Sequence, residues 1–421
     1  MKKHLDSLLE THHLDAILVT GPAQHNPAMY YMTGGGHLTG GDLIKKRGSD
    51  PLLFHYPMER DEASKTGLRT KNLAEYKMHE LLKEAGGDML KASVARYQRM
   101  LTDYGFTKGR LGLYGQVEIG PTFALFNALQ AAMPGLEIVG EITDSVLLEA
   151  MATKDSAELE RIRRMGKVTT QVVAETASFI THHNVKDEVV VKRDGSPLTI
   201  GEVKARINLW LAERGAENPE GTIFAIGRDA GVPHSAGANS DALRLGQTIV
   251  YDIFPCEAGG GYFYDFTRTW SLGYATDEAL ALYENVLSVY NQVTGELKPG
   301  MPGKHYQQRT CELFEAQGHP TIKTDPQTQS GYVHSLGHGV GLHIHERPWF
   351  GANASSTDVL EPGVVFTIEP GLYYPERGLG VRLEDTYTLT AEGKFEVFAP
   401  YPMQLVLPMR PPRPRRQMAR S

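Results

Sequence analysis

The chain has 421 residues, of which 41% are hydrophobic and 22% charged, a balance typical of soluble globular proteins that leaves room for two domains. Its formal net charge of −7 gives no general attraction to nucleic acid or to an anionic membrane, so neither is expected as a partner. Only two cysteines occur, which excludes a disulfide framework and favours a reducing, cytoplasmic compartment. In the opening sequence MKKHLDSLLETHHLDAILVTG, charged and His residues keep every apolar run short, so we expect neither a signal peptide nor a spanning helix.

The first part of the chain alternates short apolar runs typical of strands with helical patterns. A helix is expected around Leu5–Leu9 and another around Phe123–Ala132, and strands are expected at 16–19, 52–54, 110–114 and 136–139. This alternation predicts an α/β domain over residues 1–152. The glycine-rich stretch Thr33–Gly41 lacks the patterns of phosphate-binding loops, so a plain loop is favoured over a phosphate cradle.

The second part of the chain begins with a long amphipathic helix. Asp155 and Glu158 form the capping pattern at its start, which places the domain boundary near Met151–Lys154. A second capping pattern, Thr199-Ile-Gly-Glu, begins another helix that runs to Gly215, and two more are expected at about 277–293 and 304–317. We predict an α+β domain over 153–409, with helices on one side of a curved antiparallel sheet. The remaining residues, 410–421, hold five arginines and three prolines, and a disordered basic tail is favoured over a binding motif.

Two carboxylates lie in a predicted β-hairpin at the centre of this second domain. Its strands, Thr248–Phe254 and Tyr262–Trp270, flank three consecutive glycines, Gly259 to Gly261. Asp252 lies in the first strand and Asp265 in the second, although strand interiors disfavour aspartate and a buried carboxylate is costly unless paired or bound to metal. Two such groups on one hairpin would repel each other unless a cation lay between them, which is the first indication of a metal site.

Three later segments add candidate ligands. The first is HSLGHGVGLHIHE from His334 to Glu346, where glycines let the backbone and an imidazole approach a small ligand closely. The second is an apolar strand that ends in Glu369-Pro-Gly, and the third is GVRLED, in which Arg382 and Glu384 would share one strand face. Four carboxylates and a histidine suit Mn²⁺, Fe²⁺, Co²⁺ or Zn²⁺, and four negative charges suggest two ions. Two ions about 3.5–4 Å apart can bridge and deprotonate a water.

Each of these residues also has an ordinary structural interpretation. Asp252 or Asp265 could be a strand-end turn residue, and Glu369 before Pro-Gly could be a turn. Glu384 could merely pair with Arg382, and a single histidine is more often a satisfied core or surface residue than a ligand. The occurrence of all of them together, in this order, favours the metal site.

The ordered motifs resemble those of the pita-bread metallopeptidases: methionine aminopeptidase, aminopeptidase P and prolidase. The resemblance covers roughly residues 155–405 and rests on D-x-T-R-T, H-x-x-x-H-G-x-G-x-x-x-H, I-E-P-G and G-x-R-x-E-D. It implies five metal ligands, namely Asp252, Asp265, His338, Glu369 and Glu384. Asp265 and Glu384 would bridge both ions, Asp252 would chelate one, and His338 and Glu369 would bind the other. Asp252 and Asp265 lie 13 residues apart, two more than in most such proteins, but an even insertion keeps both on one face.

The extra histidine His334 and Arg382 resemble the branch that cleaves Xaa-Pro bonds, as does the N-terminal domain with its segment Tyr30-Tyr-Met-Thr-Gly. The resemblance implies a metal-bridging hydroxide that attacks the scissile carbonyl, while Glu369 transfers a proton to the leaving proline nitrogen. It also implies that His345 stabilises the oxyanion and that His234 lines the substrate site, with His334 and Arg382 also contacting substrate.

The expected enzyme is therefore a manganese-dependent Xaa-Pro dipeptidase or aminopeptidase that acts on short proline-containing peptides, with Co²⁺, Fe²⁺ or Zn²⁺ as other candidates for the metal. Relatives of this kind are often homodimers or homotetramers. Creatinase-like C–N hydrolysis is an alternative, but those relatives lack the metal ligands. A non-catalytic peptide-binding module on the same fold is a rival from a different class, and a metal-content measurement would distinguish it.

Overall fold

The computed structural model describes residues 4–409, which form two compact units. The first unit contains residues 4–151 together with Gly259–Gly261, and the second contains Ala152–Ala258 and residues 262–409. The segment 410–421, for which a basic tail is predicted, lies outside the described residues. Within the described residues, none of the helices is both long and apolar enough to cross a membrane.

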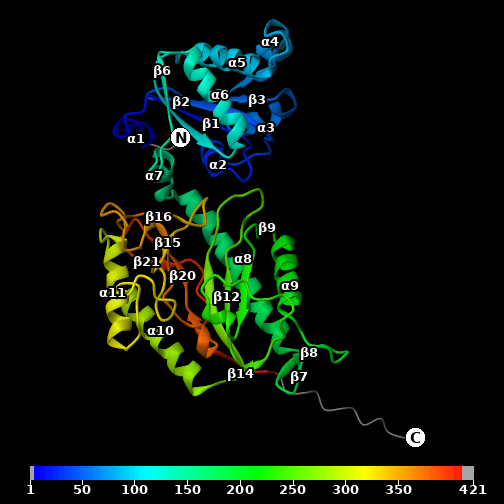
Figure 1. Cartoon of the computed structure of the whole chain (residues 1–421), viewed down its shortest axis with the longest axis vertical. Coiled ribbons are helices and arrows are strands. Elements are labelled where there is room, and N and C mark those ends of the chain that lie inside the picture. Colours follow the sequence, from blue (N-terminus) through cyan, green and yellow to red (C-terminus); the bar gives the residue numbers. More distant parts are fainter. Residues whose placement is uncertain (1–3, 410–421) are drawn as a thin grey trace, which may run out of the picture. The chain divides into compact units, whose positions relative to one another are not determined.

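The first unit is built on a six-stranded mixed sheet (Figure 1). Its strand order is β4 (Arg69–Asn72), β3 (Leu52–His55), β2 (Gly41–Lys46), β1 (Ala16–Thr20), β5 (Gly109–Gly115) and β6 (Leu136–Val139). The expected strands β1, β3, β5 and β6 are present, whereas β2 and β4 are additional. β2 escaped prediction because Lys45 and Lys46 interrupt its apolar pattern, although the Lys45 side chain is buried and paired with Asp6.

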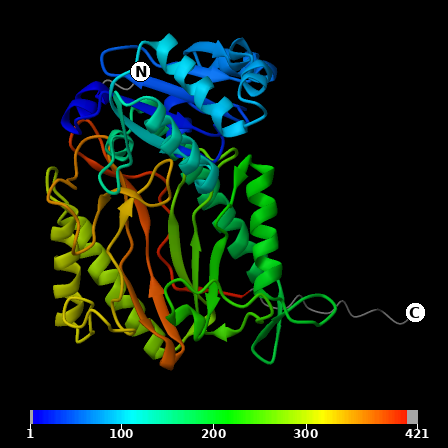
Figure 2. The ribbon, with the colours of Figure 1, turned by 45° about the horizontal axis from the view of Figure 1, so that its top comes forward.

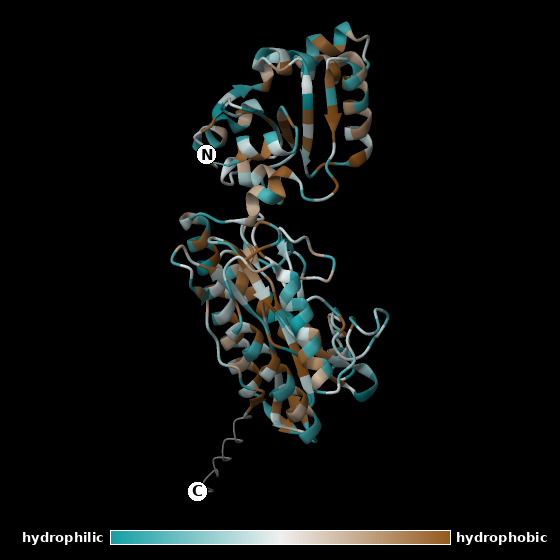
Figure 3. Cartoon of the chain, turned by 90° about the vertical axis from the view of Figure 1, so that its left-hand side faces the viewer, coloured by the Kyte–Doolittle hydropathy of each residue, from teal (hydrophilic) through white to brown (hydrophobic). Residues whose placement is uncertain are grey.

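In the described part of this unit, seven α-helices accompany the sheet: α1 (Leu5–Thr11), α2 (Pro27–Thr33), α3 (Arg60–Lys65), α4 (Met78–Glu84), α5 (Met89–Tyr104), α6 (Ile119–Ala132) and α7 (Val146–Ala152). Residues of β1, β3, α5 and α6 share one apolar core, which includes Leu18, Phe54, Leu101 and Phe126. The expected loop follows α2, which is capped by Gly34 in the left-handed region with φ of 78°. Figure 3 shows hydrophobic residues along the strands and along one side of the helices.

The three glycines of the predicted hairpin turn belong to the first unit. Gly259 O accepts a hydrogen bond from His25 N at 3.1 Å, and Gly260 has φ of 75°. A Cβ on Gly260 would lie 2.6 Å from the His25 backbone, so a side chain at Gly260 is excluded by close approach as well as by backbone conformation.

The second unit has four long helices, α8 (Ser156–Thr181), α9 (Ile200–Glu213), α10 (Asp277–Gly295) and α11 (Gly303–Ala316), all at the predicted places. Both predicted capping patterns form capping boxes, Asp155 with Glu158 and Thr199 with Glu202. In Figures 1 and 2, α8 and α9 lie beside one group of strands and α10 and α11 beside another.

The strands beside α8 and α9 form a five-stranded sheet with the order β10 (Thr222–Ile226), β12 (Thr248–Ile253), β14 (Phe266–Ala275) and β11 (Leu245–Gly246), and with β22 (Val406–Leu407) also on β14. The antiparallel pair β12–β14 is the predicted hairpin, although β14 begins at Phe266 rather than at Tyr262. Thr176 of α8 meets Tyr251 of β12, with 3.3 Å between the two side-chain oxygens.

A second five-stranded sheet has the order β16 (Glu346–Trp349), β15 (His338–Gly339), β17 (Val365–Ile368), β20 (Asp385–Leu389) and β21 (Phe395–Val397). Its apolar side shares a core with α10 and α11. The expected strand through Arg382 and Glu384 is interrupted, because β19 (Leu379–Arg382) pairs with β18 (Gly371–Tyr374), whereas β20 pairs with β17. Two further pairs are β7 (Asn184–Lys186) with β8 (Val189–Val191), and β9 (Ala216–Glu217) with β13 (Cys256–Glu257).

Candidate metal centre

The register of the β12–β14 pair places the two aspartates on one face. Asp252 pairs with Thr267, and Ile253 pairs with Phe266, so Asp265 lies level with residue 254, two positions from Asp252. Side chains two positions apart in a strand point to the same face. Both aspartates are buried, and the Asp252 carboxylate contributes to raising the pKa of Asp265.

His338 enters the same space from β15, in the middle of the glycine-rich segment. Its Nδ1 donates to the Gly339 carbonyl at 3.0 Å, so Nε2 is the nitrogen that would bind a metal once it has lost its proton. Nε2 lies 3.5 Å from Asp265 Oδ2 and 3.4 Å from Glu369 Oε1. Glycine is required at Gly337 and Gly339, because a Cβ would lie 2.1 Å from the Thr367 carbonyl oxygen and 2.0 Å from the Arg347 carbonyl oxygen, respectively.

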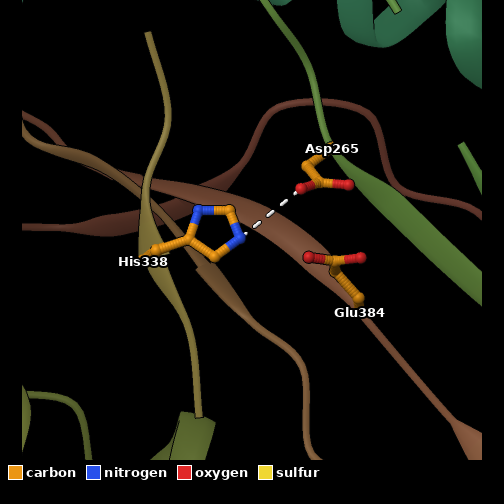
Figure 4. A group of neighbouring side chains, drawn as sticks. All are labelled: Asp265, His338 and Glu384. Atoms are coloured by element: carbon orange, nitrogen blue, oxygen red, sulfur yellow. Dashed lines mark ion pairs between the residues drawn. The ribbon is translucent and has the colours of Figure 1, made fainter. Parts of the chain in front are cut away.

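Two glutamates complete the cluster. Glu369 follows β17, and its backbone N–H donates to Leu336 O, which ties it to the segment before His338. Glu384 lies in the break between β19 and β20, and its Oε2 accepts a hydrogen bond from Thr267 Oγ1 at 2.8 Å. Figure 4 shows Asp265, His338 and Glu384 pointing toward one another from three segments, and their ligand atoms all lie within 4.8 Å of one another.

Two carboxylate oxygens in this cluster lack protein partners. Asp252 Oδ1 and Glu384 Oε1 are buried, and neither has a hydrogen-bond partner in the described part of the chain. Buried polar atoms without a partner are costly, so these oxygens indicate that the cluster binds a cation. Carboxylate oxygens with one imidazole nitrogen are also suitable ligands for a divalent first-row metal. The residues present therefore fit a metal centre.

The pKa shifts within the cluster also favour a bound cation. Burial, followed by repulsion from neighbouring carboxylates, raises the pKa of Asp265 and of Glu384 well above their usual range. Burial would lower the pKa of His338, but its contacts with Glu369 and Asp265 outweigh burial and raise it to about 9. Burial would raise the pKa of Glu369, yet His338 holds it at about 2. A bound cation would relieve the carboxylate repulsion.

Arg382 pairs with Asp252 and not with Glu384. Its Nη2 donates to Asp252 Oδ2 at 2.5 Å, and its Nη1 donates to Tyr373 OH at 2.8 Å. The interpretation of Glu384 as a simple partner of Arg382 is therefore wrong. Arg382 and Glu384 share a neighbour instead. The Thr267 hydroxyl accepts a hydrogen bond from Arg382 Nε and donates one to Glu384 Oε2.

The predicted substrate histidine His334 is joined to Arg382 through Tyr373. His334 Nδ1 donates to Ser335 O at 2.7 Å, so Nε2 accepts from Tyr373 OH at 2.9 Å. Burial lowers the pKa of His334, which keeps the ring neutral and able to accept this bond. Tyr373 was not predicted, because a tyrosine in a strand that follows Glu-Pro-Gly carries no sequence signal that separates it from an ordinary core tyrosine.

His345 and His234 are exposed residues that adjoin the cluster. The His345 ring stands edge-on to that of His338, with 4.3 Å between the ring centroids. Burial of part of the ring and the neighbouring His338 lower the pKa of His345 to about 4. His234 also contributes to lowering the pKa of His345 and of His334, which places it near both.

A surface pair of His345 with Glu346 does not occur. Glu346 is fully buried and forms an ion pair with Lys154, with 2.5 Å between Nζ and Oε1. Within the described residues, the His345 side chain forms no hydrogen bond or ion pair, so its imidazole is available to a ligand.

Known proteins resemble this chain over nearly its whole length. The Xaa-Pro dipeptidase of Pyrococcus furiosus is 26% identical over 401 residues, which cover 93% of this chain and 97% of that protein. The structure of an Xaa-Pro dipeptidase from Bacillus anthracis aligns with a TM-score of 0.74 at 22% identity, covering 96% of this chain and 98% of that one. An X-Pro aminopeptidase from Thermotoga maritima aligns with a TM-score of 0.71 at 23% identity, covering 93% and 97%.

These structural neighbours confirm the predicted fold: an α/β N-terminal domain followed by an α+β pita-bread domain. The sequence profile of metallopeptidase family M24 matches residues 160–391, a span that contains every predicted metal ligand. With a family match over more than half of its length and a buried cluster suited to divalent metal, this chain belongs to metallopeptidase family M24.

Proposed function

We propose that this protein hydrolyses the peptide bond between an N-terminal residue and proline, using two divalent metal ions. The observation that carries the proposal is the pair of buried carboxylate oxygens without partners, Asp252 Oδ1 and Glu384 Oε1, beside Asp265 and His338. The similarity to an Xaa-Pro dipeptidase over 93% of the chain supports the choice of bond.

Five residues would hold the metals. Asp265 and Glu384 would each contact both ions, Asp252 would bind one, and His338 and Glu369 would bind the other. Bound divalent ions supply a nucleophile at neutral pH by lowering the pKa of a water, and they polarise a carbonyl. Manganese is proposed as the physiological metal because the ligand set is rich in carboxylate oxygens.

The other steps belong to the side chains. Glu369 would accept a proton from the attacking water and pass it to the leaving proline nitrogen. The uncharged His345 ring, which the protein leaves without a partner within the described residues, would donate to the substrate carbonyl oxygen as negative charge develops. His234, His334 and Arg382 would line the substrate site.

The proposal assigns residues 1–152 to an N-terminal domain and 153–409 to the catalytic domain. It also includes a homodimer or homotetramer and a cytoplasmic location, the latter supported by Cys256 and Cys311, which are both free and buried.

The decisive experiment combines metal analysis with hydrolysis of defined peptides. Metal-free protein should be inactive and should regain activity with Mn²⁺ or Co²⁺. Hydrolysis of Ala-Pro should be much faster than that of Ala-Ala at equal concentration. A comparison of the hydrolysis rates of Ala-Pro and Ala-Pro-Ala separates dipeptidase from aminopeptidase activity. Full activity without detectable metal would overturn the metal proposal, and equal rates with Ala-Pro and Ala-Ala would overturn the specificity. A protein that binds peptide, but neither binds metal nor cleaves the peptide bond, would be the non-catalytic binding module instead.

A further inference from the structure

A buried arginine lies behind the metal centre and uses every N–H group of its guanidinium. Arg268 of β14 is 1% exposed. Its five N–H groups donate to the Pro402, Thr267, Glu384 and Tyr401 carbonyls and to the Asp385 carboxylate, at 3.2, 3.0, 2.6, 2.9 and 2.8 Å, respectively. The planar guanidinium fixes the directions of all five bonds, so it defines the relative positions of the segments that supply the acceptors.

Two of these acceptors belong to the segments that carry candidate ligands. Nη1 donates to Thr267 O and also to Glu384 O, so a single nitrogen joins β14 to the break between β19 and β20. The Glu384 N–H donates to the same Thr267 carbonyl at 3.1 Å. Because Thr267 is two residues after Asp265, this junction joins the segment that carries Asp265 to the segment that carries Glu384.

Asp385 anchors the guanidinium from the opposite end. Its Oδ1 accepts from Arg268, and its Oδ2 accepts from Tyr290 OH of α10 at 2.6 Å. Tyr290 in turn bonds Tyr387 at 2.6 Å. Both carboxylate oxygens of Asp385 are therefore used in this network, in contrast to those of its neighbour Glu384, of which one has no partner among the described residues.

Arg268 itself does not face the metal centre. Its neighbours Thr267 and Thr269 turn their hydroxyls toward Glu384 and toward the backbone of Arg382, so the alternation of the strand sends Arg268 the other way. Its role is therefore to act through the residues it holds.

We propose that Arg268, anchored by Asp385, is a positioning residue that holds Asp265 and Glu384 at the separation that metal binding requires. This inference rests on the proposed function. Metal binding needs both carboxylates in their ionised forms, which repel each other at this short distance, so a rigid connection between their segments keeps them together and lowers the cost of assembling the site. Loss of residues that orient metal ligands typically weakens metal binding by about 10–100-fold.

The main test is Arg268→Lys, which keeps the charge beside Asp385 but leaves at most three donors for five acceptors. Titration calorimetry of the metal-free protein with Mn²⁺ should give a Kd about 10–100-fold weaker than that of the wild type. The measurement is made well below the unfolding temperature, with the folded state checked by circular dichroism. The matched control is Arg309→Lys, because Arg309 forks onto Glu296 and touches no predicted ligand segment. Its Kd should equal the wild-type value.

A second variant keeps the proposal testable if Arg268→Lys does not fold. Tyr290→Phe removes only the hydroxyl that donates to Asp385 Oδ2, and it should weaken Mn²⁺ binding in the same direction but less. If Arg268→Lys does not fold, Tyr290→Phe decides the question. Variants that unfold at lower temperature yet keep the wild-type Kd would overturn the positioning role and leave a purely structural one. Failure of the wild-type protein to bind Mn²⁺ would instead overturn the proposed function.

Discussion

Arg382 and Asp252 form a buried ion pair beside the candidate metal centre, with Nη2 2.5 Å from Oδ2. The pair uses one oxygen of Asp252 and leaves the other, Oδ1, buried without a partner in the described residues. Arg382 also donates to Tyr373, which donates to His334, so one guanidinium fixes both a candidate metal ligand and a candidate substrate residue. Arg382 thus orients the Asp252 carboxylate through one oxygen, and the other oxygen is left for a metal ion.

Arg382→Met should strongly destabilise the metal-free protein. Removal of one partner of a buried ion pair leaves an uncompensated charge, which typically costs about 3–5 kcal/mol in the free energy of unfolding. Arg377→Met is the control, because Arg377 pairs with Glu278 at the surface, where such pairs contribute about 0–1 kcal/mol. Urea denaturation of both variants measures the difference. Equal losses of stability would show that the Arg382 pair is no more important than the surface pair.

Asp265→Ala should abolish binding of both metal ions while the fold survives. A bridging carboxylate serves each ion, and its removal also relieves repulsion on Glu384 in the metal-free state. Elemental analysis after dialysis measures the metal content, and circular dichroism checks the fold. Glu278→Ala, at an exposed carboxylate, should retain two ions. An Asp265→Ala protein that still binds two ions with near wild-type affinity would contradict the bridging role.

His345→Ala should keep both metals and change KM little, while kcat falls by about 10²–10³. The reason is that donation to an oxygen that becomes charged only in the transition state does not contribute to substrate binding. Steady-state kinetics and metal analysis on the same preparation measure both quantities. Loss of metal would make His345 a ligand, and an unchanged kcat would leave it without a catalytic role.

The metal-free protein should lose stability as the pH rises from about 7 to about 9. The raised pKa values of Asp265 and Glu384 favour folding only while these groups are protonated, so their contribution is lost above the usual carboxyl pKa of about 4. His338, with its pKa raised from about 6.5 to about 9, favours folding most at low pH and loses this contribution over that interval. Glu369, whose pKa is lowered to about 2, contributes fully above about pH 5 and does not change in this window.

Differential scanning calorimetry of the metal-free protein at several pH values tests this prediction. Addition of Mn²⁺ should raise Tm, and more so at higher pH, because the ligands bind metal in their deprotonated forms. A metal-free Tm that rises between pH 7 and pH 9 would contradict the assigned directions of these pKa shifts.

Local signals determined much of the architecture in advance. The capping patterns at Asp155 and Thr199 predicted the starts of α8 and α9, because the first turn of a helix needs hydrogen-bond acceptors that neighbouring side chains supply. The glycine-rich break between two apolar runs predicted the β12–β14 hairpin. Strand β2 was missed because its lysines are polar by type, and only the fold makes Lys45 a buried, paired residue.

The candidate ligands were identified from residue type and order, because a carboxylate in a strand interior is costly unless it is paired or bound to a metal. Their partners depended on the tertiary structure. Arg382 lies two residues from Glu384 in the sequence, yet it pairs with Asp252 because the strand breaks between β19 and β20 and each half joins a different partner. Tyr373 and Arg268 gain their roles from acceptors far away in the chain. The sequence thus determined which chemical groups were available, whereas folding decided which groups meet, because hydrogen bonds between distant segments depend on the register and packing of whole strands.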